Sequence, residues 1–168
     1  MEKKLSMAAN VAIIVVAVAI VIALAKNQLA SKKQSAGPSP GSNPMMLVKK
    51  QFPVVEPWAA YPKTVVLALS VGCHFCTASA PFYKQLTSRA EAHRINVVAL
   101  LPQSTTESSQ YLHGLGVNIP QIQQVNFADI DVIGTPTLFL ADDKGVVQEV
   151  WQGQLGVSQQ NEVFSRLQ

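Results

Sequence analysis

The feature that most limits the possible folds of this chain is a pair of cysteines between a predicted strand and a predicted helix. Cys73 and Cys76 are the only two cysteines among 168 residues. Residues 64–69 form a nearly continuous apolar run with β-branched members, as in a buried strand, and residues 77–92 have the pattern of a helix. Two intervening residues place the cysteines about one helical turn apart, within reach of a disulfide whose Cα atoms lie roughly 4.4–6.8 Å apart. The chain therefore presents a candidate redox switch at a strand-to-helix turn.

The first turn of a helix favours thiolate chemistry at Cys73. Unpaired backbone N–H groups and the helix dipole stabilise a thiolate more than a thiol at this position. Cys73 is therefore the predicted nucleophile, and Cys76 is the predicted resolving thiol that releases a mixed disulfide. A protonated His74 would lower the pKa of the Cys73 thiol further, and a solvent-facing histidine without a role is an equal alternative. Phe75 is predicted either to form a hydrophobic rim for a protein substrate or to pack against its own domain.

The predicted elements after the cysteines are an alternation of strands and helices followed by a hairpin. They are a strand at 94–101, a helix at 104–113, a short strand near 122–125, a turn of helix near Asp129, strands at 137–141 and 146–151 around the turn 142–145, and a helix at 158–167 with Ser158 as its N-cap. Strands that alternate with helices predict parallel pairing. The Asp-Asp-Lys-Gly turn predicts an antiparallel hairpin near the C-terminus.

In this order, the elements and motifs resemble the thioredoxin-like superfamily. Pro81 lies five positions after Cys76, where thioredoxins kink the same helix, and residues 134–140 resemble the cis-proline loop of that family running into a strand. X-Pro bonds are where cis peptides occur. The resemblance covers about residues 51–168 and implies an α/β thioredoxin fold, with a central mixed β-sheet flanked by helices. It also implies that Pro136 faces the cysteines and that Thr135 offers backbone groups to a substrate.

Two departures from the family pattern bear on the mechanism. Many thioredoxins have an acidic residue on the strand before the motif, whereas Leu67 stands about there, which leaves proton transfer unassigned. Glu56, Asp129 and Asp131 are candidate substitutes, but each is more simply a surface carboxylate. The dipeptide between the cysteines matches neither the strongly reducing thioredoxins nor the bacterial disulfide-forming oxidants. The short architecture looks more like the tethered, TlpA-like oxidoreductases that reduce exported proteins, cytochrome c apoproteins among them, so reduction is the favoured direction.

An apolar segment near the N-terminus predicts a transmembrane helix ahead of the domain. Residues 7–25 are apolar apart from Asn10, which is about the roughly 17–25 residues that a membrane span requires. A cleaved signal peptide is the alternative, because residues 2–4 suit its charged region and residues 23–25 suit a small-residue cleavage site. We expect an uncleaved anchor after a short tail at 1–6, since the apolar run is long for a signal peptide.

A linker is predicted over residues 26–50, and its Ser, Pro, Gly and Asn content is too poor in large apolar groups to pack. The whole chain has a net charge of +3, yet residues 51–168 hold six Lys/Arg against nine Asp/Glu, so the basic charge belongs to the N-terminal part. A basic linker is either solvated or attracted to lipid headgroups. Lysines flank the apolar segment on both sides and do not decide its orientation. An outward-facing thioredoxin-like domain fits an uncleaved signal-anchor, and the lack of further cysteines is common in exported proteins. We therefore expect a single-pass protein whose domain is extracytoplasmic, on the periplasmic or cell-surface side.

A second class of function uses the same cysteine pair to bind a soft metal. Cys73, Cys76 and His74 are predicted ligands of Cu(I) in that alternative, as in a metallochaperone. A structural zinc site would need four ligands, and His93 and His113 lack the close spacing to complete one. Covalent haem attachment needs a histidine directly after the second cysteine, where the chain has a threonine.

The expected partners follow from the redox reading of the motif. They are protein substrates with disulfides or thiols, a membrane or soluble partner that restores the thiols, and membrane lipid through the anchor. No phosphate-loop or dinucleotide motif is present, so no cofactor is expected. No basic face predicts nucleic-acid binding.

Overall fold

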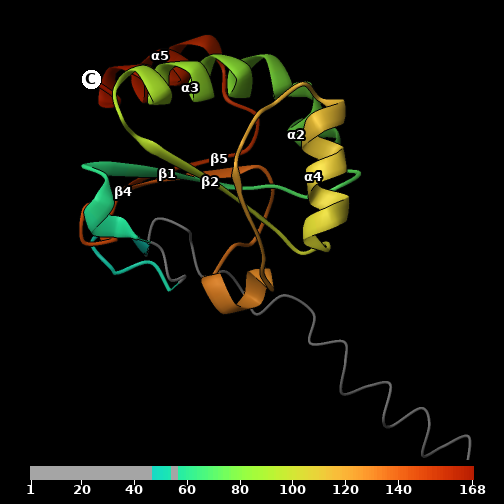
Figure 1. Cartoon of the computed structure of the whole chain (residues 1–168), viewed down its shortest axis with the longest axis horizontal. Helices are drawn as coiled ribbons and strands as arrows, with labels where there is room; N and C mark the ends of the chain where they lie inside the picture. The colour runs from blue at the N-terminus through green and yellow to red at the C-terminus, as the bar shows by residue number, and fades with distance from the viewer. Residues whose placement is uncertain (1–46, 54–56) are drawn as a thin grey trace, which may run out of the picture. The chain divides into compact units, whose positions relative to one another are not determined.

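A five-stranded mixed β-sheet forms the centre of the domain (Figure 1). The computed structural model describes residues 47–53 and 57–168. The predicted tail at 1–6, the predicted anchor at 7–25 and the linker up to residue 46 lie outside the described residues. The strands are β1 Lys63–Ala68, β2 Asn96–Leu101, β3 Gln121–Gln124, β4 Thr137–Asp142 and β5 Val147–Gln152.

The strands pair as the sequence predicts. In the sheet order β3-β2-β1-β4-β5, β2 is parallel to both β1 and β3, and β4 is antiparallel to both β1 and β5. The register places Ala68, at the end of β1, opposite Thr137, at the start of β4. The loop after β1 and the loop before β4 therefore emerge at the same end of the sheet, and these loops contain the cysteines and the predicted cis-proline motif.

The helices of the described part are η2 Trp58–Ala60, α2 His74–Ala78, α3 Ala80–Ala92, α4 Thr105–Gly114, η3 Phe127–Ile130 and α5 Val157–Arg166. The turn of helix predicted near Asp129 is confirmed as η3. The N-cap of α4 is Ser104, whose Oγ accepts the N–H of Glu107 at 3.3 Å. Among the helices of residues 47–53 and 57–168, none combines the length and the apolarity of a membrane span.

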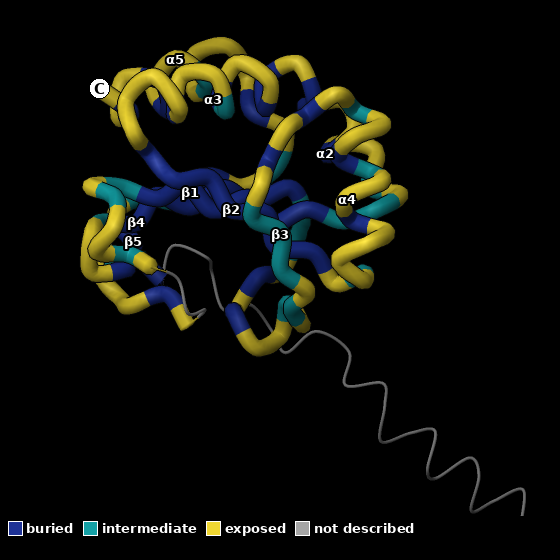
Figure 2. Tube along the Cα trace, viewed as in Figure 1, coloured by how far each residue is buried: buried dark blue, intermediate teal, exposed yellow. Residues whose placement is uncertain are grey.

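The two faces of the sheet are covered in different ways, with α3 and α5 on one side and η3 on the other (Figure 1). The strands are largely buried and the outer sides of the helices are exposed (Figure 2). One apolar cluster joins the sheet to α3, α4 and α5, and it includes Val65, Leu67, Val97, Leu138, Leu86, Leu112 and Phe164. The second cluster joins the opposite face to η3 and to residues 47–53, called the N-terminal segment below. It includes Val66, Val98, Phe139, Leu47, Phe52, Ile130 and Val132.

The helix predicted over 77–92 is divided into two. α2 and α3 are separated by Ser79, whose Oγ donates to the carbonyl oxygen of Phe75 at 2.8 Å. Pro81 lies in the first turn of α3, and its nitrogen carries no hydrogen with which to continue the helical ladder from α2. The kink that the resemblance predicts near Pro81 is thus a break between a short helix and a long one.

The folded part begins before residue 51, the boundary predicted from composition. Leu47 is buried, so the end of the linker predicted over 26–50 belongs to the domain. The N–H of Lys49 donates to the carbonyl of Val147 at 2.7 Å, and the N–H of Val147 donates to the carbonyl of Lys50 at 2.9 Å. Composition does not reveal this pairing because the segment is short and lysine-rich.

The last helix also begins earlier than predicted. The residue before α5 is Gly156, whose N–H donates to Oε1 of Gln159 at 3.2 Å. The expected N-cap, Ser158, therefore lies inside the first turn. The side chain of Gln159 thus accepts a hydrogen bond from the N–H of Gly156, the residue that precedes the helix.

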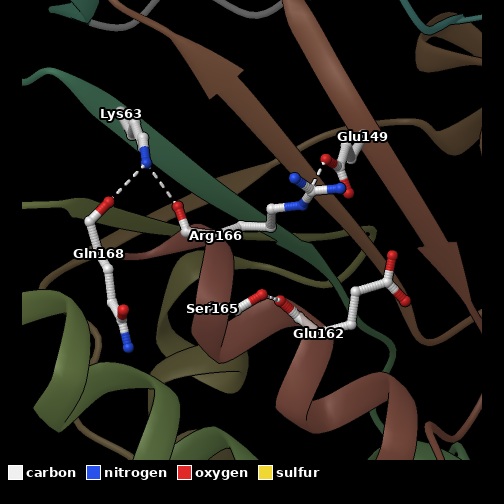
Figure 3. Close-up of polar contacts among 6 residues, drawn as sticks. All are labelled: Lys63, Glu149, Glu162, Ser165, Arg166 and Gln168. Carbon is white, nitrogen blue, oxygen red and sulfur yellow. Dashed lines mark hydrogen bonds and ion pairs between the residues drawn. The ribbon is translucent and has the colours of Figure 1, made fainter.

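Polar contacts hold the end of α5 to the sheet (Figure 3). Lys63, at the start of β1, donates from Nζ to the carbonyl oxygens of Arg166 and Gln168 at 2.5 and 3.1 Å. Arg166 Nε lies 2.8 Å from Oε1 of Glu149 on β5. A cation at the C-terminal end of a helix also interacts favourably with the helix dipole. The C-terminal helix is therefore tied to two strands of the sheet.

Candidate active site

Cys73 and Cys76 form a disulfide at the start of α2. Their Cα atoms are 5.2 Å apart, and Cys73 Sγ accepts the N–H of Cys76 at 3.1 Å. Gly72, the preceding residue, has a φ of +80°, which glycine adopts without steric cost. The N–H of Cys73 donates to the carbonyl of Ser70 at 3.2 Å. A tight turn from Ser70 to Cys73 therefore presents the first cysteine at the end of the strand.

The two sulfur-bearing residues differ in accessibility. Cys73 is half-buried, whereas Cys76 is 0% exposed and belongs to the apolar cluster under the helices. An attacking thiolate must reach a substrate, and a resolving thiol must reach only the mixed disulfide. The difference in burial therefore suits attack by Cys73 and resolution by Cys76.

Thr135 and Pro136 lie beside the disulfide, although the chain separates them from Cys73 by about sixty residues. The peptide bond between Thr135 and Pro136 is cis. The carbonyl oxygen of Thr135 is 3.5 Å from Cys73 Sγ. Thr137 Oγ1 donates to the carbonyl of Gly134 at 2.7 Å and fixes the loop at its entry into β4. The structure thus brings together the two motifs that carried the family resemblance.

The two residues between the cysteines lie at the surface of α2. His74 is exposed, and Phe75 is 55% exposed. Their rings meet edge to face with centroids 5.6 Å apart. Phe75 therefore leaves much of its ring accessible, as a residue that contacts a partner would.

The candidate proton acceptors do not converge on Cys76. Leu67 is fully buried in the same apolar cluster as Cys76. Asp129 and Asp131 are exposed in and after η3, whose Ile130 packs on the opposite face of the sheet, and Glu56 lies outside the described residues. Burial raises the pKa of Tyr83, another member of the Cys76 cluster, well above its ordinary value, so this phenol stays protonated.

Two residues that contact the motif escaped the sequence analysis. Gln103, between β2 and α4, accepts the N–H of Val71 at its Oε1 and donates from Nε2 to Ser70 Oγ, both at 3.3 Å. Tyr111 on α4 has its hydroxyl 3.2 Å from Thr77 Oγ1. A single glutamine or tyrosine on a distant element gives no local signal, and these contacts become visible only in the folded chain.

The metal alternative has few ligands in the part of the chain that is described. Within residues 47–53 and 57–168, no group of three or more His, Cys, Asp or Glu side chains is placed to hold a metal ion. His93 and His113 are exposed on the ends of α3 and α4. The Cu(I) alternative would therefore depend on Cys73 and Cys76, with a rearranged His74.

Comparison with known proteins identifies the fold. No protein-family model matches the chain, and no curated protein sequence matches it. Solved structures do match: a thiol:disulfide interchange protein DsbE from Chlorobium tepidum is 19% identical, with a TM-score of 0.55 over 66% of this chain and 83% of that one. A thiol-disulfide isomerase from Corynebacterium glutamicum is 16% identical, with a TM-score of 0.55 over 71% and 91%.

A secreted disulfide oxidoreductase from Mycobacterium tuberculosis is also similar, at 18% identity and a TM-score of 0.51 over 63% of this chain and 80% of that one. Another match, from Chlorobium tepidum TLS, is a thioredoxin family protein. Identities of this size establish a shared fold and leave the activity to be argued from the site. The described domain therefore has a thioredoxin-like fold.

Proposed function

We propose that this domain is a thiol-disulfide oxidoreductase that reduces disulfides in exported proteins. The observation that carries the proposal is the disulfide between a half-buried Cys73 and a fully buried Cys76, with Cys73 Sγ facing the carbonyl oxygen of Thr135. The solved structures of similar fold include proteins named for thiol-disulfide exchange, which supports the same chemistry here.

The reaction begins with the reduced domain. The Cys73 thiolate attacks one sulfur of a substrate disulfide, forms a mixed disulfide and expels the other substrate sulfur as a thiolate. Cys76 then gives up its proton and attacks Cys73 Sγ, which expels the second substrate sulfur and closes the Cys73–Cys76 disulfide. Two electrons pass from the domain to the substrate, and the protons lost by the domain's thiols balance those that the substrate thiolates take up. A dithiol partner then reduces the domain again.

The surroundings of the disulfide favour reduction over oxidation. Oxidants of this class are strong because their reduced form is stabilised. Here one backbone N–H, from Cys76, faces Cys73 Sγ at 3.1 Å, and the partly negative carbonyl oxygen of Thr135 lies 3.5 Å away. α2 spans only five residues before the break at Ser79. These features stabilise a Cys73 thiolate only modestly. The reduced form is therefore not strongly favoured over the disulfide, and the dithiol is a good electron donor.

The reduction potential tests the direction of electron flow. The full-length protein in detergent would be equilibrated with glutathione buffers, and the fraction of free thiols would be counted by alkylation and mass spectrometry. We expect a value near the roughly −270 mV of thioredoxin. A value near roughly −120 mV would mean that the domain donates disulfides, and the reductant proposal would be abandoned.

The proposed location is the extracytoplasmic side of a membrane, with residues 7–25 as an uncleaved anchor. The apolar composition of that segment supports this location, and one of the proteins of similar fold is described as secreted. Intact mass spectrometry of the mature protein tests the anchor. A chain that starts at Met1 and stays with the membrane in alkaline carbonate is expected, and a chain that starts at Lys26 would replace the anchor with a signal peptide.

The proposed substrate contacts surround Cys73. Thr135 would offer its backbone groups to an extended segment of the substrate, next to the cis bond to Pro136. The exposed ring of Phe75 would contact apolar side chains near the substrate cysteine. With these roles, the substrate would lie between α2 and the loop before β4.

A further inference from the structure

We infer that Gln103 is a positioning residue, which holds the turn from Ser70 to Cys73 so that Cys73 Sγ lies against the first turn of α2. The inference deepens the function proposed above, because it concerns the same cysteine. It rests on a hydrogen-bond network that joins β1, α4 and the redox motif.

The carboxamide of Gln103 is oriented by its two partners. The N–H of Val71 can only donate, so the atom 3.3 Å from it is the oxygen Oε1. Nε2 then lies 3.3 Å from Ser70 Oγ and donates to it. One side chain therefore bonds two consecutive residues immediately ahead of Gly72 and Cys73.

Gln103 is itself held by α4. The main-chain carbonyl oxygen of Gln103 accepts a hydrogen bond from the hydroxyl of Ser108 at 3.4 Å. Ser108 is buried, and its N–H donates to the carbonyl of Ser104, the N-cap of α4, at 2.9 Å. The backbone that carries Gln103 is thus fixed to the first turn of a helix, and its side chain transmits that fixed position to the redox loop.

The loop needs such a support because the strand ladder ends before it. The last bond of the ladder runs from the N–H of Leu69 to the carbonyl of Leu100 at 2.9 Å. Beyond it, the N–H of Val71 bonds to a side chain, and Gly72 adds the backbone freedom of a glycine at positive φ. Without Gln103, the turn samples more conformations, and the contact between Cys73 Sγ and the N–H of Cys76 is made for less of the time.

A matched pair of variants tests this role. Gln103→Met keeps the size of the side chain and removes both hydrogen bonds. Gln124→Met is the control, since Gln124 Nε2 donates to the carbonyl of Pro102 at 3.1 Å and does not bond to the redox loop. Both variants would be made in the full-length chain with Cys76→Ser, in detergent, so that Cys73 is the sole thiol.

The first measurement is the rate of alkylation of Cys73 by iodoacetamide as a function of pH. Gln103→Met is expected to move the pH midpoint upward and to slow alkylation at pH 7 by about threefold to tenfold, because a less stabilised thiolate is less populated. Gln124→Met is expected to react at the rate of the parent protein. An unchanged midpoint in Gln103→Met would overturn the inference. If the melting temperature alone fell in that variant, the role of Gln103 would be structural.

Gln103→Asn keeps the test decisive if Gln103→Met does not fold. It retains the amide and shortens its reach by one methylene, so the midpoint is expected to move in the same direction by a smaller amount. A midpoint equal to that of the parent would again overturn the inference. Iodoacetamide needs no protein substrate, so failure here is distinguishable from failure of the proposed function, which the glutathione equilibrium tests separately.

Discussion

The chemistry of the site depends on how differently the protein surrounds two identical side chains. Cys73 is half-buried and caps α2, whereas Cys76 is fully enclosed by apolar groups. Cys76 Sγ lies where it can attack a mixed disulfide on Cys73, since the two residues form a disulfide. A mixed disulfide on Cys73 should therefore persist long enough to be captured when Cys76 is removed.

Capture of that intermediate is the first prediction. Cys76→Ser is expected to accumulate disulfide-linked complexes with other proteins in cells, because Cys73 can still attack but nothing resolves the product. The complexes would be seen on non-reducing gels and identified by mass spectrometry. Cys73→Ser is the control. Equal yields from both variants would argue against Cys73 as the nucleophile.

A second prediction concerns Tyr83 and alkaline pH. Burial raises its pKa in the folded state above the value of about 10 that it has in an unfolded chain. Above pH 10 the unfolded chain loses this proton and the folded protein keeps it, so the free energy of unfolding falls as the pH rises, by at most about 1.4 kcal/mol per pH unit. Tyr83→Phe should flatten this decline in urea unfolding between pH 10 and 11. An unchanged slope would show that Tyr83 ionises as freely in the folded state.

The candidate redox residues can be predicted from the sequence more readily than the residues that support them. Cysteines and prolines have chemistry and backbone constraints that show in any context, so Cys73, Cys76 and Pro136 could be singled out. Gln103 acts through a hydrogen bond to a residue 32 positions away. A glutamine carries no signal for such a contact until the strands are paired.

At the scale of elements, the strands could be predicted from the sequence, but two helix boundaries could not. The strands were predictable because apolar runs in a central sheet are buried on both faces. The division of the helix predicted over 77–92 at Ser79 was not predictable. A proline indicates that the helical hydrogen bonds are interrupted, but not whether the helix bends or ends. The start of α5 was predicted two residues late, because its N-cap is Gly156, whose N–H donates to the side chain of Gln159.

The anchoring of α5 leads to the third prediction. Lys63→Met removes the hydrogen bonds from Nζ to the carbonyls of Arg166 and Gln168. We expect a loss of about 1 kcal/mol in the free energy of unfolding, the usual net worth of such bonds, measured by urea denaturation. Lys144→Met, in the exposed turn between β4 and β5, is the matched control and should change stability little. Equal effects of both substitutions would mean that the two hydrogen bonds of Lys63 in Figure 3 contribute nothing measurable.

At the scale of the molecule, the N-terminal segment completes the core on the face opposite the long helices. Phe52 is 3% exposed and its ring packs edge to face on Phe139 of β4, with centroids 5.1 Å apart. Its N–H donates to the carbonyl of Gly145 at 2.7 Å. Composition could not foresee this contribution, because Phe52 follows a polar stretch and is covered only once the hairpin is in place.

The fourth prediction tests that contribution. Phe52→Ala is expected to lower the free energy of unfolding by about 3–5 kcal/mol, since it opens a cavity against Phe139. Phe75→Ala removes a ring that is 55% exposed and should cost far less. Both would be compared by chemical denaturation of the full-length protein. A Phe52→Ala variant as stable as Phe75→Ala would show that the N-terminal segment adds nothing to the core.

The N-terminal segment pairs with the hairpin at the end of the sheet that lies away from the disulfide. It joins the sheet at Val146 and Val147, beside the end of β1 where Lys63 faces Asp142, whereas the disulfide follows the other end of β1. Six residues of strand separate the two ends by roughly 17 Å. The described chain therefore joins the sheet at one end of β1, and the redox centre lies at the other end.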